Sequence, residues 1–365
     1  MITEFKDRYE GRHDRAREYK KEGKKIIACF YGTVPKELIH AAGIIPMQLI
    51  EDRNSQYEQN SKYLPYLCGL SKNLAGQIYD KVFDYVDGVM VSTVCDTNRH
   101  VYDIWAHEKV FSHQWLVKAP SRDSEAAVNY YTMELRRLAD ELGQLSGQKI
   151  TEEALLESIV LYNENRTMLR EFYDTRPGAD ISAEDALYVF GSALVTPGDE
   201  HNAMMKKLFS SITPSSKGNQ ETKLMLCALN LNMSLDVIRM VDRYGGKVVT
   251  DDFTHNARYG SGRIKTNGDP FKALAEGYLL KVPVPGLYPI EERATYIRDL
   301  MKKADAEGMI YLIQLYCDAY ALEYGVLKQR FDGWKLPHLK IEAEDTPSSI
   351  EQLNVRIQSF LESLI

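Results

Sequence analysis

Apolar runs alternate with amphipathic segments along this chain, and one arrangement of them occurs twice. In the first half, the pattern predicts a buried strand over Ile26–Phe30, a helix over Pro35–Ala42 and a second strand over Ile45–Glu51. The same order is predicted again in the second half, over Lys223–Leu229, Ser234–Tyr244 and Lys247–Asp252. We interpret the chain as two related strand-helix units of about four strands each.

Each unit also contains an apolar run that ends in Cys-Asp, at Cys95-Asp96 and at Cys317-Asp318, and a helix-like segment follows each pair. One more strand candidate completes each unit: Gln114–Lys118 and His338–Glu342. Strands that alternate with helices imply parallel sheets, in which ligands collect beyond the carboxyl ends of the strands. Cys95 and Cys317 fall at such ends, so we expect them to belong to one site.

The segment between the two units is mostly helical, with a long amphipathic run from Thr151 to about Arg176 and a linker over Pro214–Asn219. We therefore predict an α/β protein with two related parallel-sheet domains of flavodoxin or Rossmann type and a helical connector. The expected boundaries are 1–120 for the first α/β domain with its N-terminal helix, 121–218 for the connector and 219–365 for the second α/β domain.

Bulk properties exclude several classes of function. The chain has 365 residues, enough for two domains, and its 44% hydrophobic and 27% charged content is ordinary for a soluble protein. A net charge of −7 without a long basic block argues against nucleic acid, and no apolar stretch approaches membrane-spanning length. The segment Met1–Lys25 is charged and helix-like rather than a signal peptide, so we expect a cytoplasmic protein.

The five cysteines lie at wide spacings, which argues against a disulfide framework. Cys29 and Cys227 fall inside apolar strand candidates and are expected to be small buried core residues. Cys68 lies near the start of a helix predicted from about Leu67 to Val86, where the helix dipole would stabilise a thiolate.

The other three cysteines, Cys68, Cys95 and Cys317, could hold three irons of a 4Fe–4S cluster and leave the fourth iron without a protein thiolate. Such an iron could bind substrate, as the open position of a catalytic zinc does. This inference rests on the number and placement of the cysteines, and a structural role for each remains the alternative.

With its residues laid out in this way, the chain resembles the 2-hydroxyacyl-CoA dehydratase and benzoyl-CoA reductase family of radical iron-sulfur enzymes. The resemblance covers nearly the whole chain and is carried by these segments: Cys29–Pro46, Tyr66–Cys68, Val94–Thr97, Val249–Asp252, Tyr316–Asp318 and Pro337–Arg356. It implies that Cys68, Cys95 and Cys317 bind a 4Fe–4S cluster in the cleft between the two α/β domains, and that Cys29 and Cys227 stay in the core.

The resemblance also implies partners and a reaction class. Family members work as two homologous subunits and receive low-potential electrons from a separate ATP-hydrolysing activator. We therefore expect a heterodimer that acts on a CoA thioester by single-electron chemistry, either expelling a hydroxyl group or reducing an aromatic ring. The segments Pro197–Ala203 and Gly268–Leu279 look closer to the reductase branch, whereas Glu37–Gly43 fits a dehydratase equally well. The choice between the two reactions stays open.

Three further residues are candidates for chemistry beside the cluster. Tyr31 follows the first strand and could donate its hydroxyl to a thioester oxygen, although a packed aromatic residue in a turn is an equal alternative. Glu51 is a candidate proton-handling carboxylate, with an exposed loop acid as the alternative. His255 is an acid-base candidate or a loop cap. The segment Tyr259–Arg263 suggests an anion-binding turn that could meet a CoA phosphate, but it lacks the full phosphate-loop pattern.

Two rival hypotheses remain at this stage. In the first, the subunit is an electron relay whose cluster passes electrons to a homologous catalytic subunit. An open fourth iron facing a CoA-sized cavity would favour an enzyme, and an occluded iron would favour a relay. In the second, the chain is a cluster-free α/β binding protein, and replacing Cys95 would then change neither its metal content nor its colour.

Overall fold

The computed structural model describes residues 2–31, 33–52, 66–179, 181–212, 221–229, 231–253, 258–260, 262–282, 284–286, 289–344 and 347–365. Within these residues there are two four-stranded sheets, and every strand pair in both is parallel. The first sheet has the order β2-β1-β3-β4 and the second has the order β6-β5-β7-β8. The predicted α/β class with two related parallel sheets is therefore confirmed.

The strand bounds follow the predicted runs closely. They are β1 (Ile26–Phe30), β2 (Ile45–Gln48), β3 (Gly88–Ser92), β4 (Gln114–Val117), β5 (Thr222–Cys227), β6 (Gly246–Asp251), β7 (Gly308–Gln314) and β8 (His338–Ala343). In both sheets, the order of the strands matches the start of a flavodoxin-like sheet.

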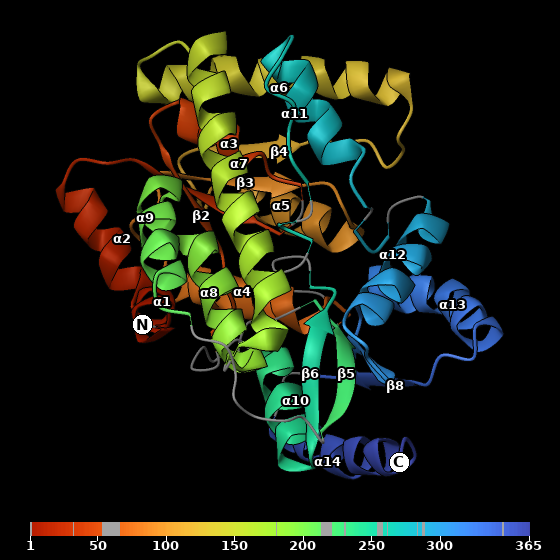
Figure 1. Cartoon of the computed structure of the whole chain (residues 1–365). Coiled ribbons are helices and arrows are strands. Elements are labelled where there is room, and N and C mark those ends of the chain that lie inside the picture. Colours follow the sequence, from red (N-terminus) through yellow and green to blue (C-terminus); the bar gives the residue numbers. More distant parts are fainter. Residues whose placement is uncertain are drawn as a thin grey trace.

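Helices cover both faces of each sheet (Figure 1). They are α1 (Ile2–Glu10), α2 (Arg12–Lys21), α3 (Lys36–Ala41), α4 (Gly69–Tyr79), α5 (Asp96–Glu108), α6 (Glu125–Ser146), α7 (Glu152–Thr175), α8 (Ala183–Val195), α9 (Gly198–Phe209), α10 (Leu231–Arg243), α11 (Pro270–Leu279), α12 (Ile290–Lys303), α13 (Asp318–Gly333) and α14 (Pro347–Glu362). None of the helices among the described residues is long and apolar enough to span a membrane.

Alternation along the strands explains this layering. In β1, Ile26 and Ala28 face one side of the sheet, and Ile27 and Cys29 face the other, because successive side chains of a strand point to opposite faces. The first side joins a large apolar cluster that also includes residues of β5 and β7, so one core runs beneath both sheets. Cys29 and Cys227 are fully buried, as predicted for core cysteines.

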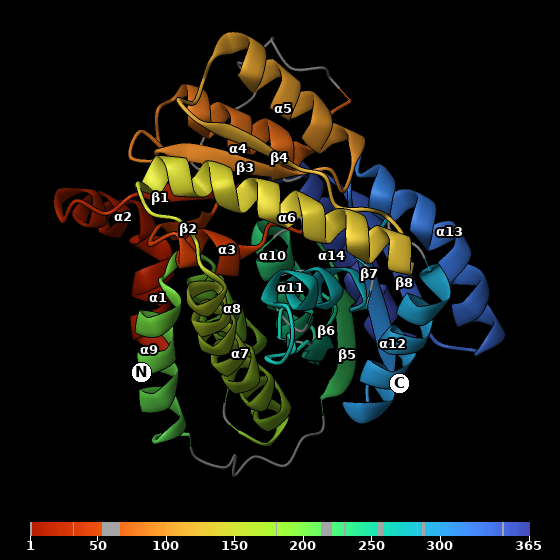
Figure 2. The ribbon, with the colours of Figure 1, turned by 90° about the horizontal axis from the view of Figure 1, so that it is seen from above.

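The helices between the two sheets hold them together. Figure 2 shows α6 lying across the first sheet, with α7, α8 and α9 grouped on the side away from α4 and α5. The helix α7 contacts α3, and Tyr173 at its C-terminal end donates or accepts a 2.6 Å hydrogen bond with Thr250 of β6. One long helix thus contacts elements of both units.

Some expected details differ from the structure. The helix predicted over Leu67–Val86 ends at Tyr79, because Lys81 adopts a left-handed backbone conformation that interrupts it. The linker predicted over Pro214–Asn219 lies outside the described residues, and the proposed domain boundaries stay a prediction.

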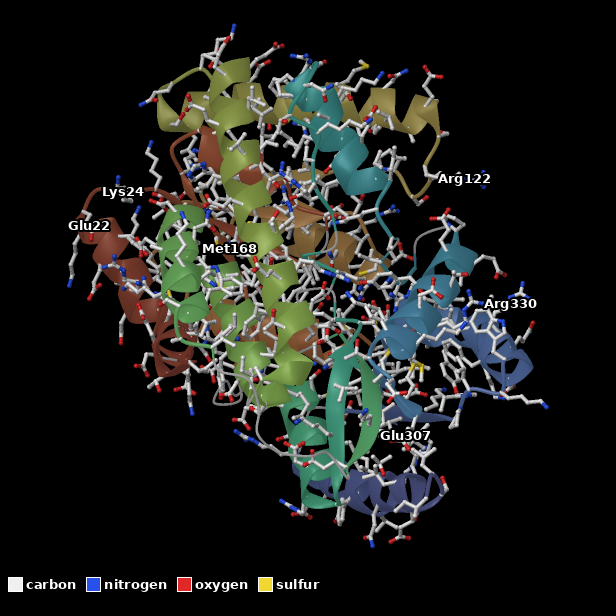
Figure 3. All side chains as sticks on the ribbon, viewed as in Figure 1. Glu22, Lys24, Arg122, Met168, Glu307 and Arg330 are labelled. Atoms are coloured by element: carbon white, nitrogen blue, oxygen red, sulfur yellow. The ribbon has the colours of Figure 1, made fainter. Side chains whose placement is uncertain are left out.

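Charged side chains cover the outside of the molecule. Figure 3 shows Glu22 and Lys24 at one edge of the molecule and Arg122 and Arg330 at the opposite edge.

Candidate cysteine site

Cys68, Cys95 and Cys317 all occupy the N-cap position of a helix: α4, α5 and α13, respectively. Cys95 lies three residues beyond the end of β3, and Cys317 lies three residues beyond the end of β7. Asp96 and Asp318 then begin their helices, where a carboxylate interacts favourably with the helix dipole. The two Cys-Asp pairs are therefore equivalent points of the two repeated units.

The three cysteines line one cavity of about 310 Å³. This volume lies at the lower end of the roughly 300–1,000 Å³ range of small-molecule sites. The other lining residues come from the loops and helix starts around the cysteines: Tyr31, Leu70, Ser71, Val94, Asp96, Thr97, Asn98, Leu229, Val284, Pro285, Gly286, Tyr316, Asp318, Ala319, Tyr320 and Leu322. We call this space the cysteine cavity.

Burial dominates the acidity of the three thiols. It raises the pKa of Cys68 and Cys317 and raises the pKa of Cys95 to about 11. The three thiols also interact electrostatically, because Cys68 raises the pKa of both Cys95 and Cys317. Ionisation of one of these thiols therefore disfavours ionisation of the others.

The first turn of each helix opposes this effect. Although the thiols do not meet ordinary cap geometry, the backbone N–H groups of Ser71, Asn98 and Tyr320 lower the pKa values of Cys68, Cys95 and Cys317. The same relationship recurs three times, each with the residue three positions after the cysteine. Each thiolate is thus favoured by the N-terminus of its own helix.

Two side chains position the cysteine loops. The amide of Asn98 donates to the carbonyl oxygens of Tyr31 at 2.7 Å and Ser92 at 2.9 Å, while its Oδ1 lies 3.4 Å from Cys95 Sγ. Ser71 Oγ lies 3.4 Å from Cys68 Sγ. Neither residue was identified from the sequence, although the Cys-x-x-Asn and Cys-x-x-Ser spacings at helix starts were available as signals.

A buried amide lies directly behind Cys68. A Cβ atom on Gly69 would come within 2.5 Å of Gln314 Nε2, so only glycine fits between them without a shift. Gln314 is 2% exposed, and neither of its side-chain polar atoms has a hydrogen-bond partner among the described residues. An unsatisfied amide beside two of the three cysteine loops fits a site whose polar contents are supplied by a bound group.

The arrangement does not suit a single metal ion. No three His, Cys, Asp or Glu side chains in the described part of the chain converge as ligands of one ion. A 4Fe–4S cluster makes no such demand, because each cysteine thiolate binds a different iron. The three cysteines of the cavity are the residue type that such a cluster uses as ligands.

Tyr31 and Glu51 form a hydrogen-bonded pair beside the cysteine cavity. Tyr31 lines that cavity, and its hydroxyl donates to Glu51 Oε2 at 2.8 Å. The other carboxylate oxygen accepts from the backbone N–H groups of Leu231 at 2.7 Å and Asn232 at 3.2 Å. Burial is the main cause that raises the pKa of Tyr31, and the adjacent carboxylate adds to it.

This geometry corrects two expectations for Glu51. The side chain is only 3% exposed, so the alternative of an exposed loop acid is wrong. It also lines a neighbouring cavity of about 200 Å³ rather than the cysteine cavity, because it is held by the N-terminus of α10. Its contact with the cysteine cavity passes through Tyr31.

His255 lies outside the described residues.

The backbone immediately before Cys317 is strained, since Tyr316 has a φ of 64°, which is unfavourable for a bulky residue. Such strain is often found beside functional groups. Tyr316 is exposed at the cavity, and Lys72 Nζ lies 5.3 Å from the centre of its ring.

Comparison with known proteins identifies the family. Residues 31–364 match the family described as 2-hydroxyglutaryl-CoA dehydratase, D-component. The match covers nearly the whole chain, and the chain belongs to this family. The resemblance drawn from the cysteine-containing segments is thereby confirmed, and the chain is an enzyme subunit of either dehydratase or reductase type.

Relatives named for the two reactions have similar sequence identity to this chain. The chain is 27% identical to one subunit of the benzoyl-CoA reductase of Thauera aromatica, over 96% of this chain and 94% of that protein. It is 25% identical to the (R)-phenyllactyl-CoA dehydratase beta subunit of Clostridium sporogenes, over 94% and 92%. It is also 25% identical to the beta subunit of (R)-2-hydroxyglutaryl-CoA dehydratase of Acidaminococcus fermentans, over 95% and 94%.

These names imply that the protein has a partner subunit, because each relative is named as one of several subunits of an enzyme. A laminin-binding adhesin from Streptococcus agalactiae is a solved structure that aligns with 94% of this chain and 100% of its own. The TM-score of 0.22 and the sequence identity of 11% are too low to carry an argument.

Proposed function

We propose that this chain is the 4Fe–4S cluster-binding subunit of an enzyme that acts on a CoA thioester by single-electron chemistry. The reaction is of the 2-hydroxyacyl-CoA dehydratase or the benzoyl-CoA reductase type. The observation that carries the proposal is that Cys68, Cys95 and Cys317 line one cavity from three separate helix starts. Relatives named for both reactions support it.

In this proposal, Cys68 and Cys95 are ligands from the first α/β domain and Cys317 is the ligand from the second, so the cluster occupies the cleft between them. The bound cluster supplies transfer of single electrons at low potential. The helix N-termini favour the thiolate form of each cysteine. Leu229, Val284 and Leu322 add apolar surface to the cysteine cavity.

Tyr31 and Glu51 act as a unit in the proposed site. Glu51 accepts the Tyr31 hydroxyl and fixes the ring at the wall of the cysteine cavity. A donor role for Tyr31 toward a thioester oxygen requires its hydroxyl to turn away from Glu51. We retain His255 as an acid-base candidate because of its place after β6 in the sequence.

We further propose a homologous second subunit and a separate ATP-hydrolysing activator as partners. Relatives that are named as single subunits of larger enzymes support the second subunit. Large apolar side chains are exposed near the cysteines, with Tyr66 at 58%, Tyr316 at 45% and Leu322 at 77% exposure. Such side chains suit contact with another protein. A reducing cytoplasm is the proposed location, since it would preserve free cysteines.

The electron-relay role is the second candidate, and the size of the cysteine cavity favours it. The space of about 310 Å³ has to hold the cluster itself. That volume is already at the lower end for a small-molecule site, so it leaves little room for an acyl-CoA within this chain. In the relay case, the substrate binds at the partner subunit, and this chain transfers electrons to it.

Electron paramagnetic resonance of the anaerobically purified, reduced protein distinguishes these roles. The spectrum is recorded for the isolated chain and for its complex with the second subunit, before and after addition of CoA thioesters. A spectral change in the isolated chain supports direct substrate binding at its cluster. A change only in the complex supports the relay, and absence of a cluster signal in both contradicts the proposal.

A further inference from the structure

A third cavity, of about 60 Å³, lies next to the cysteine cavity, and Val284 lines both. Four cationic side chains line it: Lys36 of α3, Arg166 of α7, Arg258 after β6 and Lys281 after α11. They are brought together because α7 packs against both α3 and α11. We call this space the cationic cavity.

The charges around the cationic cavity do not balance. Arg166 forms an ion pair of 2.5 Å with Glu37, and Arg258 forms one of 2.9 Å with Asp252. Asp252 is shared, since Arg293 also lies 2.5 Å from it. Two cations are thus neutralised by carboxylates that are already engaged.

Within the described ranges, the two lysines have no such partner. Lys36 is 6% exposed, and its only hydrogen bond in the described part of the chain is a long one of 3.5 Å to the carbonyl oxygen of Leu194. Neither Lys36 nor Lys281 lies within ion-pair distance of a carboxylate among the residues described. Burial lowers the pKa of each to about 8, and Arg166 contributes further to the lowering at Lys281.

Several other donors around the cationic cavity also lack acceptors. Gln48 Nε2, Arg166 Nε and the Tyr259 hydroxyl are buried atoms with no hydrogen-bond partner among the described residues. Buried polar groups are normally satisfied by protein atoms or by ordered water. Residues of three separate segments thus bring unsatisfied donors to the lining of one small cavity, which also carries two lysines without a carboxylate partner. This combination suits an acceptor-rich occupant of negative charge.

We propose that the cationic cavity binds one small oxyanion, either a carboxylate group or a phosphate-type group. Its oxygens would accept from the ammonium groups of Lys36 and Lys281 and from the side chains of Gln48 and Tyr259. A cavity of about 60 Å³ has room for a few water-sized groups, which suits a single oxyanion and excludes a nucleotide. The turn near Tyr259 noted in the sequence thus contributes a side chain to this site.

The oxyanion has two possible sources. It is either a free inorganic anion or the anionic end of a ligand whose remainder enters the cysteine cavity. Contact between the two cavities supports the second source, because Tyr320 lines the cysteine cavity and accepts from Arg258 Nη2 at 3.1 Å. Only this second source rests on the proposed function; the binding of a free oxyanion stands apart from it.

Calorimetric titration of the full chain tests the proposal. The ligands are inorganic phosphate, sulfate, glutarate and coenzyme A, each at matched ionic strength with chloride as the background. We expect phosphate, sulfate or glutarate to bind, and Lys36→Met and Lys281→Met each to weaken that binding about tenfold or more. Lys265→Met is the matched control, because Lys265 is exposed and paired with Glu276 at 2.8 Å.

Thermal unfolding shows whether a variant that loses oxyanion binding is still folded. Lys36→Met removes a buried, uncompensated charge, so its melting temperature without oxyanion should equal or exceed that of the native chain. The same phosphate concentration should raise its melting temperature less than it raises that of the native chain. Absence of binding by phosphate, sulfate and glutarate to the native chain overturns the proposal, as does unchanged binding in both lysine variants. Coenzyme A binding without response to any of the small anions also overturns it.

The same titration on Cys95→Ala separates this proposal from the function assigned above. Retained oxyanion binding in a chain that holds no iron supports the cationic cavity independently of the cluster. If glutarate binds more tightly than phosphate only when the cysteines are intact, the oxyanion belongs to a ligand shared with the cysteine cavity. Loss of all oxyanion binding in Cys95→Ala contradicts a self-contained cationic cavity.

Discussion

Cys95 and Cys317 occupy equivalent positions in the two repeated units of this protein. Each lies three residues beyond a parallel strand and is the N-cap residue of the following helix. They come close enough for Cys95 to raise the pKa of Cys317. The repeated units therefore place two thiols in one site, although the two cysteines lie more than two hundred residues apart in the sequence.

Glu51 is predicted to stabilise the junction between the two units. Replacing it with alanine removes the acceptor for Tyr31 Oη and for the N–H groups of Leu231 and Asn232, so we expect a loss of roughly 2–4 kcal/mol in the free energy of unfolding. Urea denaturation measures this change. Glu157→Ala, at an exposed helical position, should stay within about 0.5 kcal/mol.

A second substitution tests whether the main role of Glu51 is structural or catalytic. Glu51→Gln keeps an acceptor at the N-terminus of α10 and should be more stable than Glu51→Ala. If Glu51→Gln is as stable as the native chain but the assembled enzyme loses its turnover, proton handling rather than capping is the main role of this carboxylate.

Gln314 is expected to destabilise the cluster-free protein. Its amide is buried without a hydrogen-bond partner among the described residues, so Gln314→Met should raise the free energy of unfolding by about 1–2 kcal/mol. Gln77→Met is the matched control and should have the opposite effect, because Gln77 Nε2 donates to Ile50 at 3.0 Å and Asn73 at 2.8 Å. Destabilisation by both variants would show that the Gln314 amide is satisfied in solution.

At position 316, the glycine variant should be more stable than the alanine variant, which is the reverse of the usual order. Because its φ is 64°, we expect Tyr316→Gly to unfold at a higher temperature than Tyr316→Ala, by a margin that corresponds to about 1 kcal/mol. The exposed Tyr130 in the middle of α6 provides the comparison, since there alanine should be more stable than glycine. The same order at both positions would argue against backbone strain beside Cys317.

The stability of the protein should depend on pH through the two lysines of the cationic cavity. Burial lowers the pKa of Lys36 and Lys281 from 10.5 to about 8 in the folded chain, against the opposing effects of Glu37 on both and Cys29 on Lys36. Between these pH values the unfolded chain binds more protons, so the stability of the anion-free protein should rise with pH. Arg166 and Arg258, which also lower the pKa of Lys281, stay charged throughout.

Oxyanion affinity should change in the opposite direction. Binding requires protonated lysines, so phosphate should bind more weakly as the pH rises above about 8. Titrations at several pH values between neutrality and the ordinary lysine pKa measure this dependence. In Lys36→Met the rise in stability with pH should be reduced, and a profile identical to that of the native chain would exclude Lys36 as one of the titrating groups.

Local patterns were sufficient to predict much of the fold. The run Ile26–Phe30 forms β1 with the predicted bounds, because a strand buried on both faces is apolar throughout. Thr151 caps α7 through its side chain, which accepts from Ala154 N. Features of this kind are set by neighbouring residues and can therefore be read from the sequence.

Features that depend on distant residues were missed. The helix α10 begins at Leu231 rather than at the predicted Ser234, because the carboxylate of Glu51, in the other unit, accepts its first N–H groups. The cationic cavity was missed in the same way, since Lys36 and Lys281 meet only through the packing of α7 and α11. No local spacing connects either pair.

One of the two segments that look closer to the reductase branch, Pro197–Ala203, contains a histidine of the core. His201 in α9 is fully buried and lies 2.8 Å from Asn165 Nδ2 and 3.2 Å from Ser192 Oγ. Burial lowers its pKa to about 3, so it stays neutral in the core between α7, α8 and α9. His201 therefore has a packing role in this segment.

The most direct test of the account is the iron and acid-labile sulfide content of anaerobically purified variants. We expect about four irons per chain in the native protein and in the core controls Cys29→Ala and Cys227→Ala. Cys68→Ala, Cys95→Ala and Cys317→Ala should each lose most of this iron while remaining folded. A native chain without iron, or full iron content in all three site variants, would contradict the assignment of these cysteines to a 4Fe–4S cluster.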